Sequence, residues 1–176
     1  VILFGDDIVI ISDKASDFDT EEAPDIAWRR WYKGALKKSI KQVEGAMRTI
    51  RERPDSVFLD AKASRPVPLP IGPSGCRRLH LVGIARPRRD PEIVPETWPG
   101  LTYVGEATEL PFQIGRLDVK DAIVHIFDGP TINLLLETLD TAPDFIAYLK
   151  GREAALRTAD KYEFVERDLL AAAVIG

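Results

Sequence analysis

The chain has 176 residues, of which 45% are hydrophobic and 30% are charged, a composition typical of one soluble globular domain with a substantial core. No apolar run approaches the ~18 residues that a membrane-spanning helix needs, so we expect no membrane partner. The single cysteine, Cys76, leaves no internal disulfide to form. It is typical of a reducing compartment, so a cytoplasmic protein is expected.

Charge is distributed unevenly along the chain. The formal net charge of −4 by itself disfavours nucleic acid as a partner. Between Ile26 and Arg53, however, nine basic residues stand against two acidic ones, which gives this segment a charge of +7. The remainder has 15 basic and 26 acidic residues and therefore a charge of −11. One element thus carries a concentrated positive charge on an otherwise acidic protein.

In chain order, the first predicted elements are a hairpin and a long helix. Val1–Phe4 and Ile8–Ser12 are apolar runs around "GDD", a turn-forming sequence, and predict two paired strands. From about Pro24 to Arg53, apolar residues recur at steps of three and four, which predicts an amphipathic helix with a basic outer face. Because the chain begins inside an apolar strand and without Met, we expect the natural protein to continue upstream.

The remaining segments predict further strands and helices. Strands are expected at Ser56–Ala61, Arg78–Ala85 and Ala122–Gly129, and helices at residues 130–140, 142–157 and 164–176. This order predicts an α/β (α+β) fold with a mixed central sheet, the long helix and C-terminal helices. We expect residues 1–92 to form a core and residues 93–176 to form a strand-and-helix extension packed on it.

Three segments carry a resemblance to a known superfamily: "ILFGDDIVIISDK", "WRRWYKGALKKSIKQVEGA" and "SVFLDA". A hairpin followed by a long helix and further strands resembles the later part of the core of the PD-(D/E)XK, or restriction-endonuclease-like, nucleases. The segment "VHIFDGPTINLLLETLDTAPDFIAYLKGRE" is similar to one in uncharacterised bacterial proteins that carry this core. The resemblance implies a metal-dependent nuclease, or a nuclease-like domain that binds nucleic acid, with residues 1–92 as its core.

The family's chemistry uses an acid on one hairpin strand and an acid-x-Lys motif on the next, which hold a divalent metal and position the attacking water. The resemblance gives Lys14 the lysine role and places the second acid at Ser12, while the first acid would precede Val1. Asp13 would hold Mg²⁺ or Mn²⁺ if the strand is distorted there, because alternation otherwise turns it away from Lys14. Gln42 matches the helical glutamine of related nucleases and would orient these groups.

Several interpretations of this strand stay open. Asp13 and Lys14 belong to a working variant of the nuclease site, to an ordinary solvated strand end, or to an inactive descendant that still binds nucleic acid. A literal match to the motif letters at Asp55, Asp60 and Lys62 is disfavoured, because too few residues separate the two acids to turn a hairpin. A catalytically inactive protein-interaction module of the same fold is the alternative from another class.

The basic face of the long helix is the candidate nucleic-acid surface. Lysine and arginine on one face would release counterions from the phosphates of DNA or RNA, although a solvated amphipathic helix has the same pattern. The expected contacts are Arg29, Arg30, Lys33, Lys37, Lys38 and Lys41. A second basic cluster is expected around one strand and its loop: Arg77, Arg78, Arg86, Arg88 and Arg89.

Two further predictions concern histidine and assembly. His80 and His125 each lie in an apolar strand with no histidine, cysteine or acid at ligand spacing. We therefore expect core or sheet-surface histidines and no metal site. The sheet edge left open upstream of Val1 would pair with another copy of the chain, which predicts a homodimer through this edge.

Overall fold

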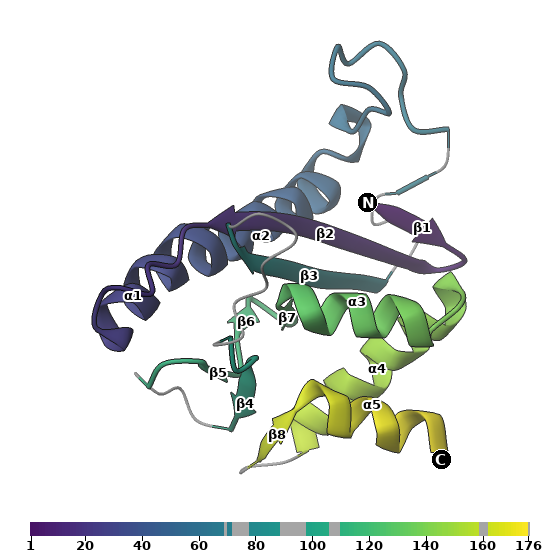
Figure 1. Ribbon diagram of the computed structural model, residues 1–176. Helices are drawn as coiled ribbons and strands as arrows, with labels where there is room; N and C mark the ends of the chain where they lie inside the picture. Colours follow the sequence, from purple (N-terminus) through teal and green to yellow (C-terminus); the bar gives the residue numbers. More distant parts are fainter. Residues whose placement is uncertain (69, 72–77, 89–97, 106–109, 159–161, 176) are drawn as a thin grey trace.

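The computed structural model describes residues 1–68, 70–71, 78–88, 98–105, 110–158 and 162–175, and within them the chain has mixed α+β content (Figure 1). The strands are β1 (Ile2–Phe4), β2 (Asp7–Ser16), β3 (Arg78–Pro87), β4 (Thr102–Val104), β5 (Gln113–Gly115), β6 (Asp118–Val119), β7 (Ala122–Phe127) and β8 (Glu163–Val165). The helices are α1 (Pro24–Trp31), α2 (Lys37–Glu52), α3 (Gly129–Thr138), α4 (Ala142–Thr158) and α5 (Glu166–Ile175).

The central sheet has five strands in the order β1-β2-β3-β7-β6. β2, β3 and β7 are parallel, and the antiparallel strands β1 and β6 lie at the two ends. The long helix makes the crossover from β2 to β3, as a parallel pair requires. β6 and β7 come from the segment predicted as a C-terminal extension, so both halves of the chain build the central sheet. β5, β4 and β8 form a second, three-stranded sheet.

The predicted hairpin is confirmed, but its second strand is longer than predicted. β1 pairs antiparallel with Asp7–Val9, and Gly5 has a positive φ of 53° in the turn between them. β2 continues through Ser16, and all ten of its residues pair with β3. Asp13 and Lys14 therefore lie inside a paired strand, opposite residues 84 and 85 of β3, and not at a strand end. The polar residues did not stop the strand because β3 supplies backbone partners along its whole length.

The predicted long helix is confirmed, with one irregularity. α1 and α2 are joined by a π-helical segment, Tyr32–Leu36, so the helical rod runs without a break from Pro24 to Glu52. In a π segment each backbone hydrogen bond spans one more residue than in an α-helix. The buried face of the rod includes Trp28 and Trp31, which confirms the expectation that these tryptophans are core residues.

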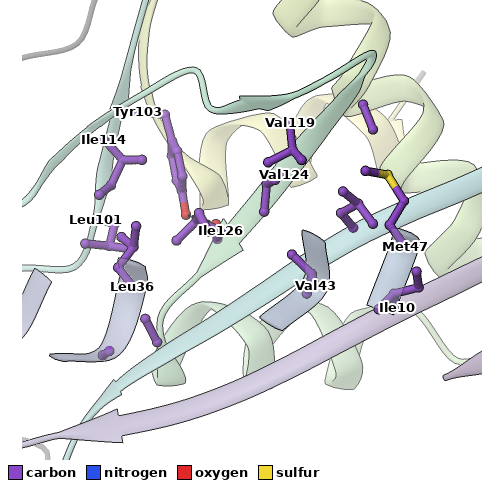
Figure 2. Packing of buried hydrophobic residues seen from close by; sticks show 14 of the residues in the cluster. Ile10, Leu36, Val43, Met47, Leu101, Tyr103, Ile114, Val119, Val124 and Ile126 are labelled. Atoms are coloured by element: carbon purple, nitrogen blue, oxygen red, sulfur yellow. Dashed lines mark hydrogen bonds between the residues drawn. The ribbon is translucent and has the colours of Figure 1, made fainter. Parts of the chain in front are cut away.

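The rod packs closely on one face of the central sheet (Figure 1). Figure 2 shows Leu36, Val43 and Met47 of the rod, which belong to the same buried apolar cluster as Ile10 and Val124 of the sheet. One close approach is at Gly83 of β3, where an added Cβ would lie 3.1 Å from Ser39 Oγ of α2 and 2.8 Å from Ile126 Cδ1 of the paired strand β7. Ser39 donates its hydroxyl to the Ser12 carbonyl at 3.0 Å, which satisfies a polar group in this contact.

The opposite face of the central sheet carries α3, α4 and α5. Side chains of β2, β3 and β7 that alternate with those facing the rod pack there, among them Val9, Val82 and Phe127. Leu135 of α3 and Leu149 of α4 belong to the same apolar cluster and are fully buried. The sheet is thus covered on both faces, as its nearly continuous apolar strands predict.

Two predicted elements differ from the structure. Ser56–Ala61 is not a strand: a short 3-10 turn at Pro54–Ser56 precedes a loop in which the Asp60 carboxylate accepts backbone N–H groups of Lys62 and Arg65. These local bonds compete with strand pairing, which is reduced to a single bridge between Phe58 and Pro66.

At the C-terminal end, the predicted helix starts at Glu166, and the residues just before it form β8. Cys76, Arg77 and Arg89 lie outside the described residues.

Candidate functional site

The side chains of β2 alternate between the two faces of the sheet, and this separates the predicted site residues. Ile8 and Ile10 face the rod, and Ser12 follows them in the same alternation; Lys14 takes the next position on this face. Ser12 Oγ donates to Gln42 Oε1 of α2 at 2.8 Å. The structure therefore places Ser12, Lys14 and Gln42 on one side of the sheet, where α2 passes over β2.

Asp13 lies on the other face. Its carboxylate forms a two-point ion pair with Arg86 of β3, in which Nε donates to Oδ1 at 3.0 Å and the second guanidinium nitrogen contacts Oδ2. Both side chains are exposed. The strand is not distorted to turn Asp13 toward Lys14, so the structure does not bring these two residues to one metal ion.

The polar group beside α2 consists of Ser12, Lys14 and Gln42 and contains no acid. Ser12 is buried, Lys14 is half-buried and Gln42 is exposed, so the group reaches from the sheet to the surface. In the described part of the chain, no carboxylate forms a hydrogen bond or an ion pair with any of the three. A hydroxyl, an amide and an ammonium together suit an anion, since an ammonium and an amide nitrogen both carry hydrogen-bond donors. They are a poor ligand set for Mg²⁺, which prefers carboxylates.

The predicted basic surface lies on the exposed side of the rod. All six predicted contacts are exposed: Arg29, Arg30, Lys33, Lys37, Lys38 and Lys41. Arg30 forms an ion pair with Glu22 at 2.5 Å, and the Lys37 ammonium lies 5.8 Å from the centre of the Tyr32 ring. Lys38 stands one helical turn before Gln42, on the same side of the helix. Lys14 and Gln42 are therefore continuous with this basic surface.

A second polar cluster lies under α4, on the sheet face opposite Lys14. The buried Asp7 carboxylate contacts His80 Nε2 at 2.8 Å and the Lys150 ammonium at 2.7 Å. Burial raises the pKa of Asp7, but the hydrogen bonds from Lys150 and His80 outweigh it and hold the pKa below the usual 3.8. Asp7 is therefore ionised in the fold, and His80 donates its Nε2 proton to it.

The cluster continues across β7 to a buried ion pair. Arg152 of α4 donates to Glu166 at 2.7 Å and 3.1 Å, and both side chains are 2% exposed. Burial opposes the charge of Arg152, but Glu166 outweighs it and raises the arginine's pKa. The Tyr148 hydroxyl also contacts Glu166. Burial, followed by the charge of Glu166, raises the pKa of Tyr148 above its usual value, so the phenol stays protonated and donates.

His125 joins the two halves of the cluster under α4. Its Nδ1 lies 3.3 Å from an Arg152 nitrogen. Its Nε2, like His80 Nδ1, is buried without a hydrogen-bond partner among the described residues. One ligand atom each from His80, His125 and Glu153 lie within 4.8 Å of one another. Both histidines are fully buried, which confirms the core placement expected from sequence. The fold nevertheless brings the two rings close to each other and to Glu153, which their spacing in the sequence did not indicate.

Sequence reasoning missed this cluster because its members are far apart in the chain. The parallel pairing of β3 with β7 sets Val82 opposite His125, and His80 lies two residues before Val82 on the same face. A usable signal was present: the chain's two histidines each interrupt an apolar strand. A polar residue within a strand buried on both faces needs a polar partner from elsewhere in the fold.

Comparisons of the chain with protein-family models, with curated proteins and with solved structures found no match. The resemblance to PD-(D/E)XK nucleases therefore stays a prediction. Among the described residues, no helix is both long enough and apolar enough to cross a membrane. Phe4 of the edge strand β1 is 48% exposed, and pairing of two copies through this edge also stays a prediction.

Proposed function

We propose that the chain is a nucleic-acid-binding domain of nuclease-like architecture that holds the phosphate backbone against the rod and the adjoining part of β2. The observation that carries the proposal is the 2.8 Å hydrogen bond between Ser12 and Gln42. It joins the two positions to which the resemblance assigns the second acid and the helical glutamine. The proposal assigns phosphate contacts to Lys14, Lys38 and Gln42 and to the basic residues along the rod.

The charge distribution supports this assignment. Six exposed cations follow one another over Arg29–Lys41, and the segment Ile26–Arg53 carries +7 while the remainder carries −11. A polyanion is attracted to the rod and repelled by the rest of the surface, which orients it over the rod. Affinity should come mainly from counterion release and should depend steeply on salt.

Binding without hydrolysis is the form of the proposal that the geometry favours. The position assigned to the metal-holding acid is a hydroxyl, and Asp13 is paired with Arg86 on the other face. A working nuclease needs two acids on one face to hold Mg²⁺ or Mn²⁺. Cleavage of the bound strand is therefore treated as an outcome of the test, as is a domain that binds protein only.

The test measures binding of labelled single- and double-stranded DNA and RNA by fluorescence anisotropy between about 50 and 200 mM salt. The variant Lys33→Ala/Lys38→Ala/Lys41→Ala should weaken binding and lower the slope of log K against log salt by about 3, one for each lost phosphate contact. A control of equal charge change, Lys62→Ala/Arg65→Ala/Arg167→Ala, should leave that slope unchanged.

The proposal is overturned if none of the four nucleic acids binds at the lowest salt, or if the two triple variants behave alike. Incubation of each substrate with Mg²⁺ or Mn²⁺, and with EDTA, extends the test to hydrolysis. Metal-dependent cleavage that is lost in Lys14→Ala would establish a working variant site in β2 and would contradict binding without hydrolysis.

A further inference from the structure

We propose that His80, His125 and Glu153 bind one divalent cation of the borderline class that includes Zn²⁺, between the central sheet and α4. This site is independent of the proposed nucleic-acid surface, because it lies on the opposite face of the sheet from Lys14. Its ligands come from β3, β7 and α4, so the bound ion would link α4 to the two strands.

Two buried nitrogens point to a ligand. His80 Nδ1 and His125 Nε2 are buried, and neither has a hydrogen-bond partner in the described part of the chain. A buried polar atom without a partner is unfavourable and rare in folded proteins. Here two such atoms come from histidines on neighbouring strands. One ring nitrogen of each histidine lies within 4.8 Å of the other and of a Glu153 oxygen. A ligand that contacts both nitrogens removes both deficits.

Glu153 supplies the third donor. Its carboxylate lies with the two ring nitrogens in a group no wider than 4.8 Å. Two atoms bonded to one tetrahedral zinc ion lie about 3.4 Å apart, because each bond is about 2.1 Å long and the bonds meet at about 109°. The closure that this requires is available to Glu153, because its side chain is 26% exposed and reaches in from a helix. Arg157 contacts Oε1, and Oε2 remains as a ligand atom.

Asp7 orients the first histidine. A metal-bound histidine commonly donates its other ring N–H to a carboxylate, which fixes the ring and its tautomer. His80 makes this contact through Nε2 to Asp7 at 2.8 Å, which leaves a lone pair on Nδ1. Lys150 holds the other oxygen of Asp7 at 2.7 Å, and Arg78 lies 4.0 Å from the first. Lys150 and Arg78 thus hold the Asp7 carboxylate in place, and Asp7 in turn fixes the His80 ring.

Arg152 is the competing group. A guanidinium only donates, so its contact with His125 Nδ1 at 3.3 Å favours the tautomer that carries the proton on Nε2. Metal binding requires the lone pair of Nε2, which moves the proton to Nδ1 and turns this contact into one between two donors. Arg152 must then withdraw from His125, while its two shorter bonds to Glu166 remain. The cation and the Arg152–His125 hydrogen bond are thus mutually exclusive.

The donor set fixes the class of ion. Two imidazoles and one carboxylate suit Zn²⁺ and related transition ions, whereas Mg²⁺ and Ca²⁺ prefer oxygen ligands only. Three protein ligands leave one position of a tetrahedral ion for water. Because the ion binds the folded chain, it should stabilise that chain in proportion to the logarithm of its concentration.

The experiment uses the full chain without a histidine tag, treated with chelator and then titrated with Zn²⁺. The chain has only two histidines, so ring-nitrogen NMR observes both without any substitution. The expected result is a change at His80 Nδ1 and His125 Nε2 that saturates at one equivalent, together with a melting temperature that rises with Zn²⁺ concentration. Mg²⁺ at the same concentrations should produce neither effect.

A matched pair of variants tests the third ligand. Glu153→Gln should lower the affinity for Zn²⁺, measured by calorimetry, more than 10-fold, which is the smallest loss typical of removing an outer-shell partner. The exposed substitution Glu137→Gln on α3 should leave the affinity unchanged. The proposal is overturned if the two ring nitrogens do not respond to excess Zn²⁺, if binding does not saturate near one equivalent, or if Glu153→Gln binds as tightly as the unmodified chain.

Discussion

The two faces of the central sheet are built from alternate residues of the same strands, yet they are stabilised differently. The face under the rod is almost entirely apolar, with Ser12 and Ser39 as its buried polar residues. The face under α4 buries two histidines, an arginine and two carboxylates, each held by a partner from another element. A periodic apolar pattern predicts the first arrangement, whereas the second depends on contacts that only the finished fold creates.

This difference has an energetic side. On an apolar face, a cavity or an extra methyl group lowers the free energy of unfolding through its local contacts, and the other contacts remain. In a buried ionic cluster each charge depends on its partner, since removing one partner leaves the other as an uncompensated buried charge. The face under α4 should therefore react to the loss of one partner far more strongly than the face under the rod reacts to a small change in packing.

The largest expected effect is the loss of Arg152. Arg152→Met should lower the free energy of unfolding by about 3–5 kcal/mol, because it leaves Glu166 as an uncompensated buried charge. Urea unfolding monitored by tryptophan fluorescence measures the change. The double variant Arg152→Met/Glu166→Gln should regain a substantial part of it, since the remaining side chain is neutral and still accepts a bond from Tyr148. If the double variant is no more stable than the single one, the loss does not come from leaving the Glu166 charge without its partner.

An intermediate effect is expected at Gly83, a close contact between the central sheet and the rod. Gly83→Ala places a Cβ 3.1 Å from Ser39 Oγ of α2 and 2.8 Å from Ile126 Cδ1 of the paired strand β7, and it should lower stability by about 1–3 kcal/mol through overpacking. Gly45→Ala is the matched substitution within α2, where an added Cβ meets nothing within 4 Å. It should raise stability by up to about 1 kcal/mol, because alanine favours helix. Equal effects of the two substitutions in thermal unfolding would contradict the close approach of rod and sheet.

The smallest effect is expected where charge is exposed. Hydrogen bonds from Arg51 hold the pKa of Asp121 below its usual 3.8, and the side chain is 71% exposed. Asp121→Asn should therefore lower stability by less than about 1 kcal/mol near neutral pH. Because the carboxylate's pKa is lower in the folded chain, its contribution is complete above about pH 4 and is lost as the pH falls through that lowered value. Unfolding measured at several pH values should show the variant and the unmodified chain converging in acid.

Residue periodicity predicted the elements whose stability comes from apolar packing. The hairpin, the rod and the strands β3 and β7 all follow from their patterns, within a few residues at each end. The prediction of a strand at Ser56–Ala61 was wrong, because the Asp60 carboxylate accepts hydrogen bonds from backbone N–H groups of its own loop. The predicted β2 also ended too early, at Ser12, because the strand's length is set by its partner β3 and not by its own residues.

The candidate site divides in the same way. Alternation correctly separated Asp13 from Lys14. Gln42, to which the resemblance gave an orienting role, contacts Ser12, and that role stays a prediction. For the cluster under α4, the sequence showed only that a histidine interrupts each of two apolar strands, and not which residues meet there. Asp7 meets Lys150 across 143 positions of sequence, and His80 meets His125 only through the register of two parallel strands. Such contacts depend on the whole topology, which no local pattern encodes.

The π segment Tyr32–Leu36 also sets the phase of the rod. One residue of an α-helix corresponds to a rotation of about 100° about its axis. Removing a single residue from this segment would make the rod more regular, but it would turn α1 by that angle relative to α2. Trp28 and Trp31 would then leave the core while Val43 and Met47 stayed in it. The extra residue is what allows one continuous helix to present a single buried side along its full length.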